Sequence, residues 1–177
     1  SGSDFPVVTN LFGTARRVEL AFGRRPVEFV RTVARAAMEL LPPVPSKLWE
    51  FRGLAGAGVR VGLRNHAEGP VMECLTTAPD LTRLPALTSS PDDGGPFLTL
   101  PLVYTEHPGP DGHGHNLGMY RMQVHDRTTT GMHWQLGKGG GFHHAAAERD
   151  GRDLPVTAFL GGPPAMILAA VAPLASG

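Results

Sequence analysis

Histidine is concentrated in one short window of this sequence, and such a window can supply metal ligands. Seven of the eight histidines lie between His107 and His144. Asn116 follows the His113–His115 run and precedes residues 118–126, which are predicted to form a strand. A metal site needs several oxygen or nitrogen ligands that converge. The alternative is a polar hairpin with surface histidines, because no pair here has zinc-motif spacing.

The predicted strand at residues 118–126 carries several long side chains. Because alternate side chains of a strand point to the same side, its odd-numbered positions should share one face. These positions are Met119, Arg121, Gln123 and His125. This face begins directly after the loop position of Asn116, from which a side chain can reach a ligand.

A second possible site is the glycine run at residues 137–141, which contains Lys138. Glycines let the backbone approach a ligand closely, and consecutive amide N–H groups can bind phosphate. A helix predicted at residues 144–149 adds the positive end of a helix dipole. The preceding Met132–Gln135 segment holds an aromatic ring and hydrogen-bonding groups, which favours a flavin-like ligand. The alternative is a flexible hairpin tip with a solvated lysine.

Two further features are interpreted as structural. The Leu160–Pro164 turn, with sequence LGGPP, can bind an anion but more often lets a helix pack closely on its strand. Cys74 is the only cysteine, so an internal disulfide is excluded. Nothing around Cys74 indicates a reactive thiolate.

The first 58 residues are predicted to form a helical, α/β-type segment. Thr14 can cap a helix from Ala15 to about Phe22. Pro26 opens a longer helix to Leu41, in which apolar residues recur at helical spacing. Residues 5–10 are predicted to form a strand. A domain boundary is expected near Gly58, where helical spacing gives way to short strands.

Residues 59–177 are predicted to form an antiparallel barrel or sandwich, since short strands alternate with Pro- and Gly-rich turns. The sequence contains 23 glycines and 17 prolines, which agrees with many turns. The strands are expected at 59–63, 70–75, 97–105, 118–126, 130–136 and 154–160, with helices at 144–149 and 163–172.

Composition narrows the class of protein. The formal net charge is zero, so bulk electrostatics do not suggest a nucleic-acid or membrane-surface partner. No apolar run approaches the roughly 20 residues of a membrane span. A single cysteine agrees with a reducing cytoplasm.

Four motifs then occur in a fixed order along the chain. They are PVVTNLFGT at residues 6–14, NLGMYRMQ at 116–123, MHWQ with the following KGG at 132–140, and LGGPP at 160–164. Together they resemble UbiD-family decarboxylases along nearly the whole chain. The NLGMYR run is highly specific, whereas the Gly-Gly-Pro-Pro turn alone is a weak signal.

The resemblance implies an α+β fold in which a flavin-reductase-like split β-barrel occupies residues 59–177. It implies prenylated FMN, a divalent metal that is usually manganese, and a potassium ion at the flavin phosphate. Asn116 and His143 match metal ligands, with His144 as the alternative. Arg121 matches the arginine of the family's arginine–glutamate catalytic network. The implied cofactor contacts are Met119, Tyr120, Arg121, His133, Trp134, Gln135, Lys138 and Gly139.

Family members are longer than this chain. In the resemblance, the remaining metal-ligand glutamate and the acidic proton donor follow the LGGPP helix, and no acidic residue here matches them. Without that glutamate, Arg121 is expected to be less fixed. We therefore expect part of a non-oxidative decarboxylase for α,β-unsaturated or aromatic acids, inactive alone, that forms a homo-oligomer or joins a second chain. The alternatives are a flavin- or metal-binding subunit without its own catalysis, and a structural remnant.

Overall fold

The computed structural model describes residues 4–39, 44–54, 66–109, 114–135 and 137–172. The chain divides into two compact units, one of residues 10–77 and one of residues 1–9 with 78–177. The boundary predicted near Gly58 and the strand predicted at 59–63 lie outside the described residues.

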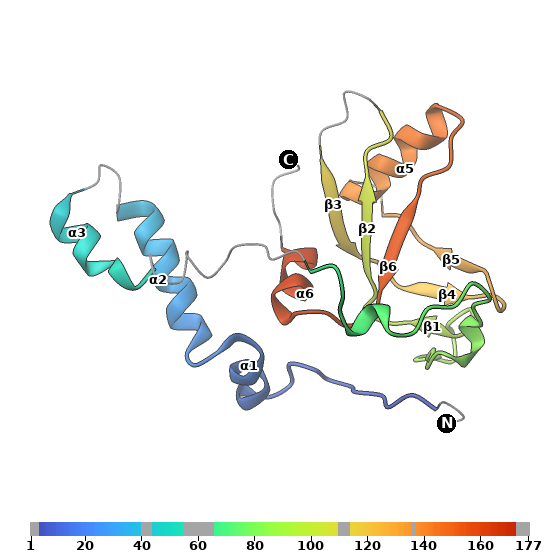
Figure 1. Ribbon diagram of the computed structural model, residues 1–177, viewed down its shortest axis with the longest axis horizontal. Helices are drawn as coiled ribbons and strands as arrows, with labels where there is room; N and C mark the ends of the chain where they lie inside the picture. The colour runs from blue at the N-terminus through green and yellow to red at the C-terminus, as the bar shows by residue number, and fades with distance from the viewer. Residues whose placement is uncertain (1–3, 40–43, 55–65, 110–113, 136, 173–177) are drawn as a thin grey trace. The chain divides into compact units, whose positions relative to one another are not determined.

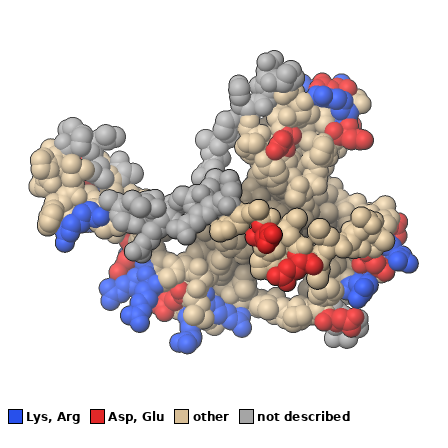
Figure 2. All heavy atoms as spheres, viewed as in Figure 1, with Lys and Arg blue, Asp and Glu red and all other residues tan. Residues whose placement is uncertain are grey.

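The described part of the unit of residues 10–77 is helical. It contains α1 (Ala15–Phe22), α2 (Pro26–Glu39), α3 (Pro45–Glu50) and the 3-10 helix η1 (Pro70–Met72). Both predicted helices are confirmed, and the Thr14 side chain accepts a hydrogen bond from the Arg17 N–H at 3.2 Å. Figure 2 shows basic side chains gathered over α1 and α2, which carry Arg16, Arg17, Arg31 and Arg35.

Two predicted strands in the first half of the chain are wrong. Residues 70–75 begin with the 3-10 helix, because Pro70 opens that helix at its first position. Residues 5–10 have no regular structure, and their side chains are exposed. An apolar pair such as Val7-Val8 forms a strand only when a neighbouring strand pairs with it.

The other unit contains two three-stranded sheets, and every strand pair in its described part is antiparallel (Figure 1). One sheet has the order β1 (Phe97–Leu98), β4 (Met122–Val124), β5 (Thr130–Met132), and the other β3 (His115–Met119), β2 (Leu102–Glu106), β6 (Val156–Phe159). The helices are η2 (Leu81–Arg83), α5 (Gly139–Arg149) and α6 (Pro164–Val171). The mixed α+β class is confirmed, and no closed barrel forms among the described residues.

Two long predicted strands are each broken into two. Leu100 has a φ of 58° and is followed by Pro101, which separates β1 from β2. The second break falls between Met119 and Met122, where the ring of Tyr120 folds back over Gly118 and is buried. Met119 and Gln123 therefore belong to different sheets, and the single face predicted for residues 118–126 is wrong.

The core of this unit is centred on β2, the middle strand of its sheet. Leu102 and Val103 are completely buried. Helix α5 packs across β2 and β3, and it contributes the buried residues Ala146 and Ala147 (Figure 1). This helix begins five residues earlier than the predicted start at residue 144, so the glycine run forms its first turn.

The turn between β4 and β5 gives the unit one acid-sensitive element. Asp126 Oδ1 accepts hydrogen bonds from the N–H groups of Thr128 and Thr129, both at 2.8 Å. Its hydrogen bonds with Thr129 and Thr128 lower the pKa of Asp126 from 3.8 to about 2. The carboxylate therefore stabilises the folded chain above pH 3.8, and this contribution is lost as pH falls through about 2.

We therefore expect the Asp126→Asn variant to lose less stability than the wild type as the pH falls from 4.5 to 2. Urea unfolding at several pH values measures this difference. Asp153→Asn, an exposed substitution outside the turn, serves as the control. A wild-type-to-variant gap that stays constant over this range would contradict the assignment.

In the part of the chain that the structure describes, no helix has both the length and the apolar character required to cross a bilayer.

Candidate functional site

An aromatic cluster covers the start of α5. The rings of Tyr120 and Trp134 meet edge to face with centroids 5.0 Å apart, and Trp134 stacks on His144 at 5.8 Å. The Tyr120 hydroxyl accepts a hydrogen bond from the Gly140 N–H at 3.3 Å. Tyr120, which follows β3, and Trp134, which precedes α5, thus both contact the first turn of this helix.

Packing requires the three consecutive glycines at residues 139–141. A Cβ atom at Gly140 would lie 2.5 Å from Trp134 Cζ3, and one at Gly141 would lie 2.6 Å from the Gln135 carbonyl oxygen. A Cβ atom at Gly139 would collide with the Asn116 side chain. The sequence interpretation attributed these glycines to ligand access, whereas here they let α5 approach β3 and residues 133–135 closely.

Asn116 lies on β3 against the first residue of α5. Its Nδ2 atom is buried and has no hydrogen-bond partner within the described residues. An unsatisfied buried amide costs about 1–3 kcal/mol. Because the oxygen and nitrogen of an amide can be exchanged by rotation, the carboxamide can present either atom to a ligand.

His143 is buried on the same side of the sheet as Asn116. Thr105 is the cross-strand partner of Asn116, so their side chains share a face, and Thr105 Oγ1 lies 2.9 Å from His143 Nδ1. Burial, with smaller effects from His107 and His115, lowers the pKa of His143. A neutral imidazole whose Nδ1 is engaged by Thr105 leaves Nε2 as its other ligating atom.

Lys138 is the N-cap residue of α5. Its side chain makes no capping hydrogen bond, and the first turn of the helix contains no acidic residue. A cation at this end is unfavourable, because the first-turn N–H groups already carry partial positive charge. An anion such as a phosphate would relieve both effects.

Arg121 follows Tyr120 in the chain and contacts residues at and before the first strand of the other sheet. Its Nη1 donates a hydrogen bond to Asp93 Oδ1 at 3.2 Å, and its guanidinium lies 4.2 Å from the centroid of the Phe97 ring. That Arg121 is less fixed in this chain stays a prediction, although a carboxylate of the chain contacts it.

The predicted site residues divide into two groups. Six of them gather around the start of α5: Asn116, Tyr120, Trp134, Lys138, Gly139 and His143. His133 and Gln135 are exposed beside this cluster, Met119 is half-buried at the end of β3, and Arg121 contacts the 89–97 segment. No group of three or more His, Cys, Asp or Glu side chains suited to a metal occurs among the described residues. Asn116 and His143 would thus supply only part of a ligand set.

Two contributors were missed by the sequence interpretation. Thr105 shares a strand face with the completely buried Val103, and that alternation was an available signal. Asp93 lies in a loop that contains none of the motifs, and its pairing with Arg121 across 28 residues has no local signature.

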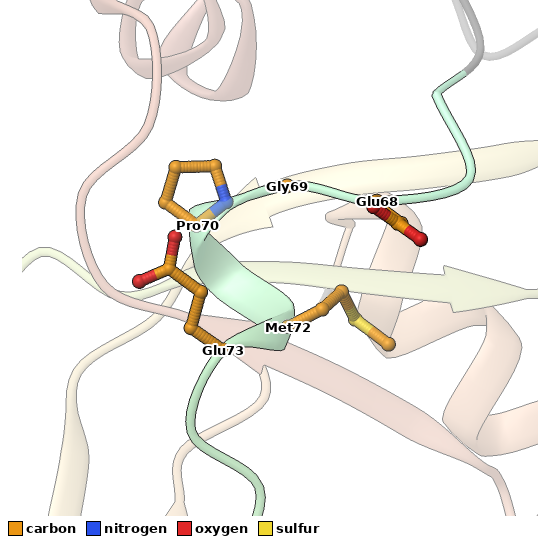
Figure 3. A pocket seen from close by; sticks show the side chains of 5 residues that line it. All are labelled: Glu68, Gly69, Pro70, Met72 and Glu73. Carbon is orange, nitrogen blue, oxygen red and sulfur yellow. The ribbon is translucent and has the colours of Figure 1, made fainter.

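A separate depression of about 460 Å³ lies in the helical unit (Figure 3). It is lined by Glu68, Gly69, Pro70, Met72 and Glu73, with Glu73 beside Pro70 and Met72 extending away from them. None of the predicted site residues lines it.

We expect Thr105→Val to lower the free energy of unfolding by about 1–3 kcal/mol, because a buried imidazole nitrogen loses its partner. Urea unfolding measures the change. Thr157→Val on the neighbouring strand β6 is the matched control, since Thr157 is exposed and the substitution there should be nearly neutral. Equal effects at the two positions would contradict a role for the Thr105–His143 contact.

Two models of known protein families match this sequence. The 3-octaprenyl-4-hydroxybenzoate carboxy-lyase Rift-related domain (UbiD) matches residues 63–177, and the N-terminal domain of the same carboxy-lyase matches residues 1–37. The chain belongs to the UbiD family. The motif resemblance is therefore confirmed, and it covers both units of the chain.

Several relatives match this chain over nearly its whole length. A protein of Chlamydia pneumoniae, named as one of the subunits of a 4-hydroxybenzoate decarboxylase, is 44% identical over 98% of the chain. The chain spans 29% of the length of this and the other chlamydial relatives it matches. It is thus equivalent to a part of those proteins.

Solved UbiD-class structures share the fold. The enzyme HmfF of Pelotomaculum thermopropionicum, in complex with prFMN, is 31% identical, with a TM-score of 0.55 over 61% of this chain and 25% of that one. Vanillic acid decarboxylase of Sedimentibacter hydroxybenzoicus, in closed form, has a TM-score of 0.73 over 98% of this chain and 35% of that one, at 22% identity. The second match supports the fold alone.

Proposed function

We propose that this chain forms the flavin-binding part of a prenylated-FMN-dependent, non-oxidative decarboxylase for α,β-unsaturated or aromatic carboxylic acids. The observation that carries the proposal is the start of α5, where the N-cap residue Lys138 provides no side-chain cap and lies near the Tyr120–Trp134 pair. A split β-barrel built from the two antiparallel sheets is part of the same proposal.

The residues at this helix end fit a phosphate-bearing flavin. The phosphate would be held by Lys138 and by the first-turn N–H groups other than that of Gly140, which donates to Tyr120. An aromatic ring system would pack beside Trp134. When bound, the prenylated flavin supplies the electron sink for loss of CO₂. Arg121 would bind the substrate carboxylate through its guanidinium, which offers paired donors.

Metal binding is also part of the proposal. Asn116, whose amide lacks a partner among the described residues, and His143 would contribute two ligands to a divalent ion such as manganese. A potassium ion would bind at the flavin phosphate. Hard cations of this kind take oxygen ligands readily, and the remaining ligands would come from outside these residues.

Catalysis is proposed to need polypeptide beyond this chain. Decarboxylation requires a proton donor for the carbon that loses CO₂, and such a group is typically worth about 10²–10⁴-fold. The first turn of α5 contains no acidic residue. The chlamydial relative is named as one subunit of a 4-hydroxybenzoate decarboxylase, which favours a second chain here over self-association.

The alternative function is a flavin- or metal-binding subunit that has no catalysis of its own. Absorption spectra and elemental analysis of the purified chain separate the possibilities. A flavin band with manganese supports the decarboxylase proposal, metal without flavin supports the metal-binding subunit, and neither would leave a structural role.

A direct assay completes the test. The chain, reconstituted with prenylated flavin, manganese and potassium, is incubated with cinnamic and aromatic acids, and CO₂ is measured. We expect flavin binding without CO₂ release. Release by a monodisperse monomer would show that the proton donor lies within this chain, and failure to bind flavin would overturn the proposal itself.

A further inference from the structure

Arg121 is held on two sides by residues that no motif pointed to. Asp93 accepts a hydrogen bond from Nη1 at 3.2 Å, and the Phe97 ring lies 4.2 Å from the guanidinium carbon. The arginine side chain nevertheless remains 62% exposed. Its orientation is thus set by two contacts while much of its surface stays open to solvent.

Asp93 is also restrained by hydrogen bonds that do not involve the arginine. Its Oδ2 accepts hydrogen bonds from the N–H groups of Ser89 at 3.0 Å and Ser90 at 3.1 Å, and its side chain is only 14% exposed. Oδ2 therefore binds the backbone of the turn, whereas Oδ1 binds Arg121. A carboxylate restrained in this way can restrain its partner in turn.

A second contact ties the same loop to the sheet. Gln123, on β4, donates a hydrogen bond from Nε2 to the Gly94 carbonyl oxygen at 2.6 Å. Arg121 and Gln123 thus bind adjacent residues of one loop. These two neighbouring contacts restrain the loop, and Asp93 with it, relative to the start of β4.

We propose that Asp93 is a positioning residue, which orients the Arg121 guanidinium so that its remaining N–H groups can bind a substrate carboxylate. A guanidinium carries five N–H donors, and one of them is used by Asp93 in the described structure. The Phe97 face blocks one side of the plane, so the open edge is the route for an anion. The inference rests on the proposed carboxylate-binding role of Arg121.

Asp93 thereby supplies within this chain the carboxylate contact that was expected to be missing. A free arginine would have to order several rotatable bonds when it binds an anion, whereas a held arginine has already lost that entropy on folding. The pKa of Asp93 is lowered by its hydrogen bonds with Ser90 and Ser89 and by Arg121, so the residue remains an anion at neutral pH.

The test is NMR of the purified 177-residue chain, with the Arg121 Nε–H signal assigned by an Arg121→Met variant. We expect this signal to be sharp in the wild type, broadened in Asp93→Asn and restored in Asp93→Glu. Asp92→Asn, which changes an exposed neighbour in the same loop, should leave it unchanged. Dispersed amide spectra establish that each variant is folded.

Benzoate, as an aromatic carboxylate probe, is then titrated at low salt. It should shift the Arg121 signal in the wild type, and Asp93→Asn should weaken binding about three- to tenfold. An unchanged Nε–H signal in Asp93→Asn, tighter benzoate binding by that variant, or no benzoate effect on wild-type Arg121 would each overturn the inference. Flavin binding is measured separately on the same samples. If flavin binds but one of these results is obtained, this inference fails while the proposed function stands.

Discussion

Replacing Gly140 with alanine is expected to lower the free energy of unfolding of the β-sheet unit by about 1–3 kcal/mol. The added methyl group would lie 2.5 Å from Trp134 Cζ3 and 3.0 Å from the Tyr120 hydroxyl. Alanine favours a helix over glycine by about 1 kcal/mol, so a net loss means that the steric effect exceeds the helical preference. The aromatic cluster would have to separate or α5 would have to move away from β3.

Trp134 fluorescence during urea unfolding measures this change in a Trp49→Phe background, which leaves one tryptophan. Gly94→Ala is the matched control, because a Cβ atom there meets only the end of the flexible Gln123 side chain at 3.4 Å. Flavin binding should fall together with stability in Gly140→Ala. A variant as stable as the wild type would show that α5 does not depend on this close approach.

Replacing Lys138 with serine is expected to change stability and flavin binding in opposite directions. Serine can accept a hydrogen bond from a first-turn N–H, which is worth about 1 kcal/mol, and the change removes a cation from the positive end of α5, worth about 0.3–1 kcal/mol. The chain should therefore be more stable. Loss of the charge-assisted contact to phosphate should weaken FMN binding about tenfold or more.

Thermal unfolding without ligand and quenching of flavin fluorescence measure the two effects of Lys138→Ser. The control is Lys138→Arg, which keeps the charge and should leave both quantities near those of the wild type. Riboflavin, which lacks the phosphate, should bind wild type and Lys138→Ser equally. Parallel losses of stability and FMN binding would indicate a packing role for Lys138 and would contradict phosphate binding.

The sequence alone determined the elements whose signals are local. Thr14, Pro26 and the apolar spacing of α2 specify two helices, because capping and helical periodicity act within a few residues. The NLGMYR and HWQ motifs likewise identified the family. They also named Asn116, Tyr120 and Trp134, which the structure gathers at the start of α5.

Tertiary structure decided the features that depend on distant partners. A glycine run is a poor helix former, so α5 begins at Gly139 only because those glycines fit against Asn116 and Trp134. The chain crosses between sheets after Met119, where Tyr120 is buried and the strand alternation ends. Asp93 meets Arg121 across 28 residues. Such contacts form when the chain packs, and local propensity contains no information about them.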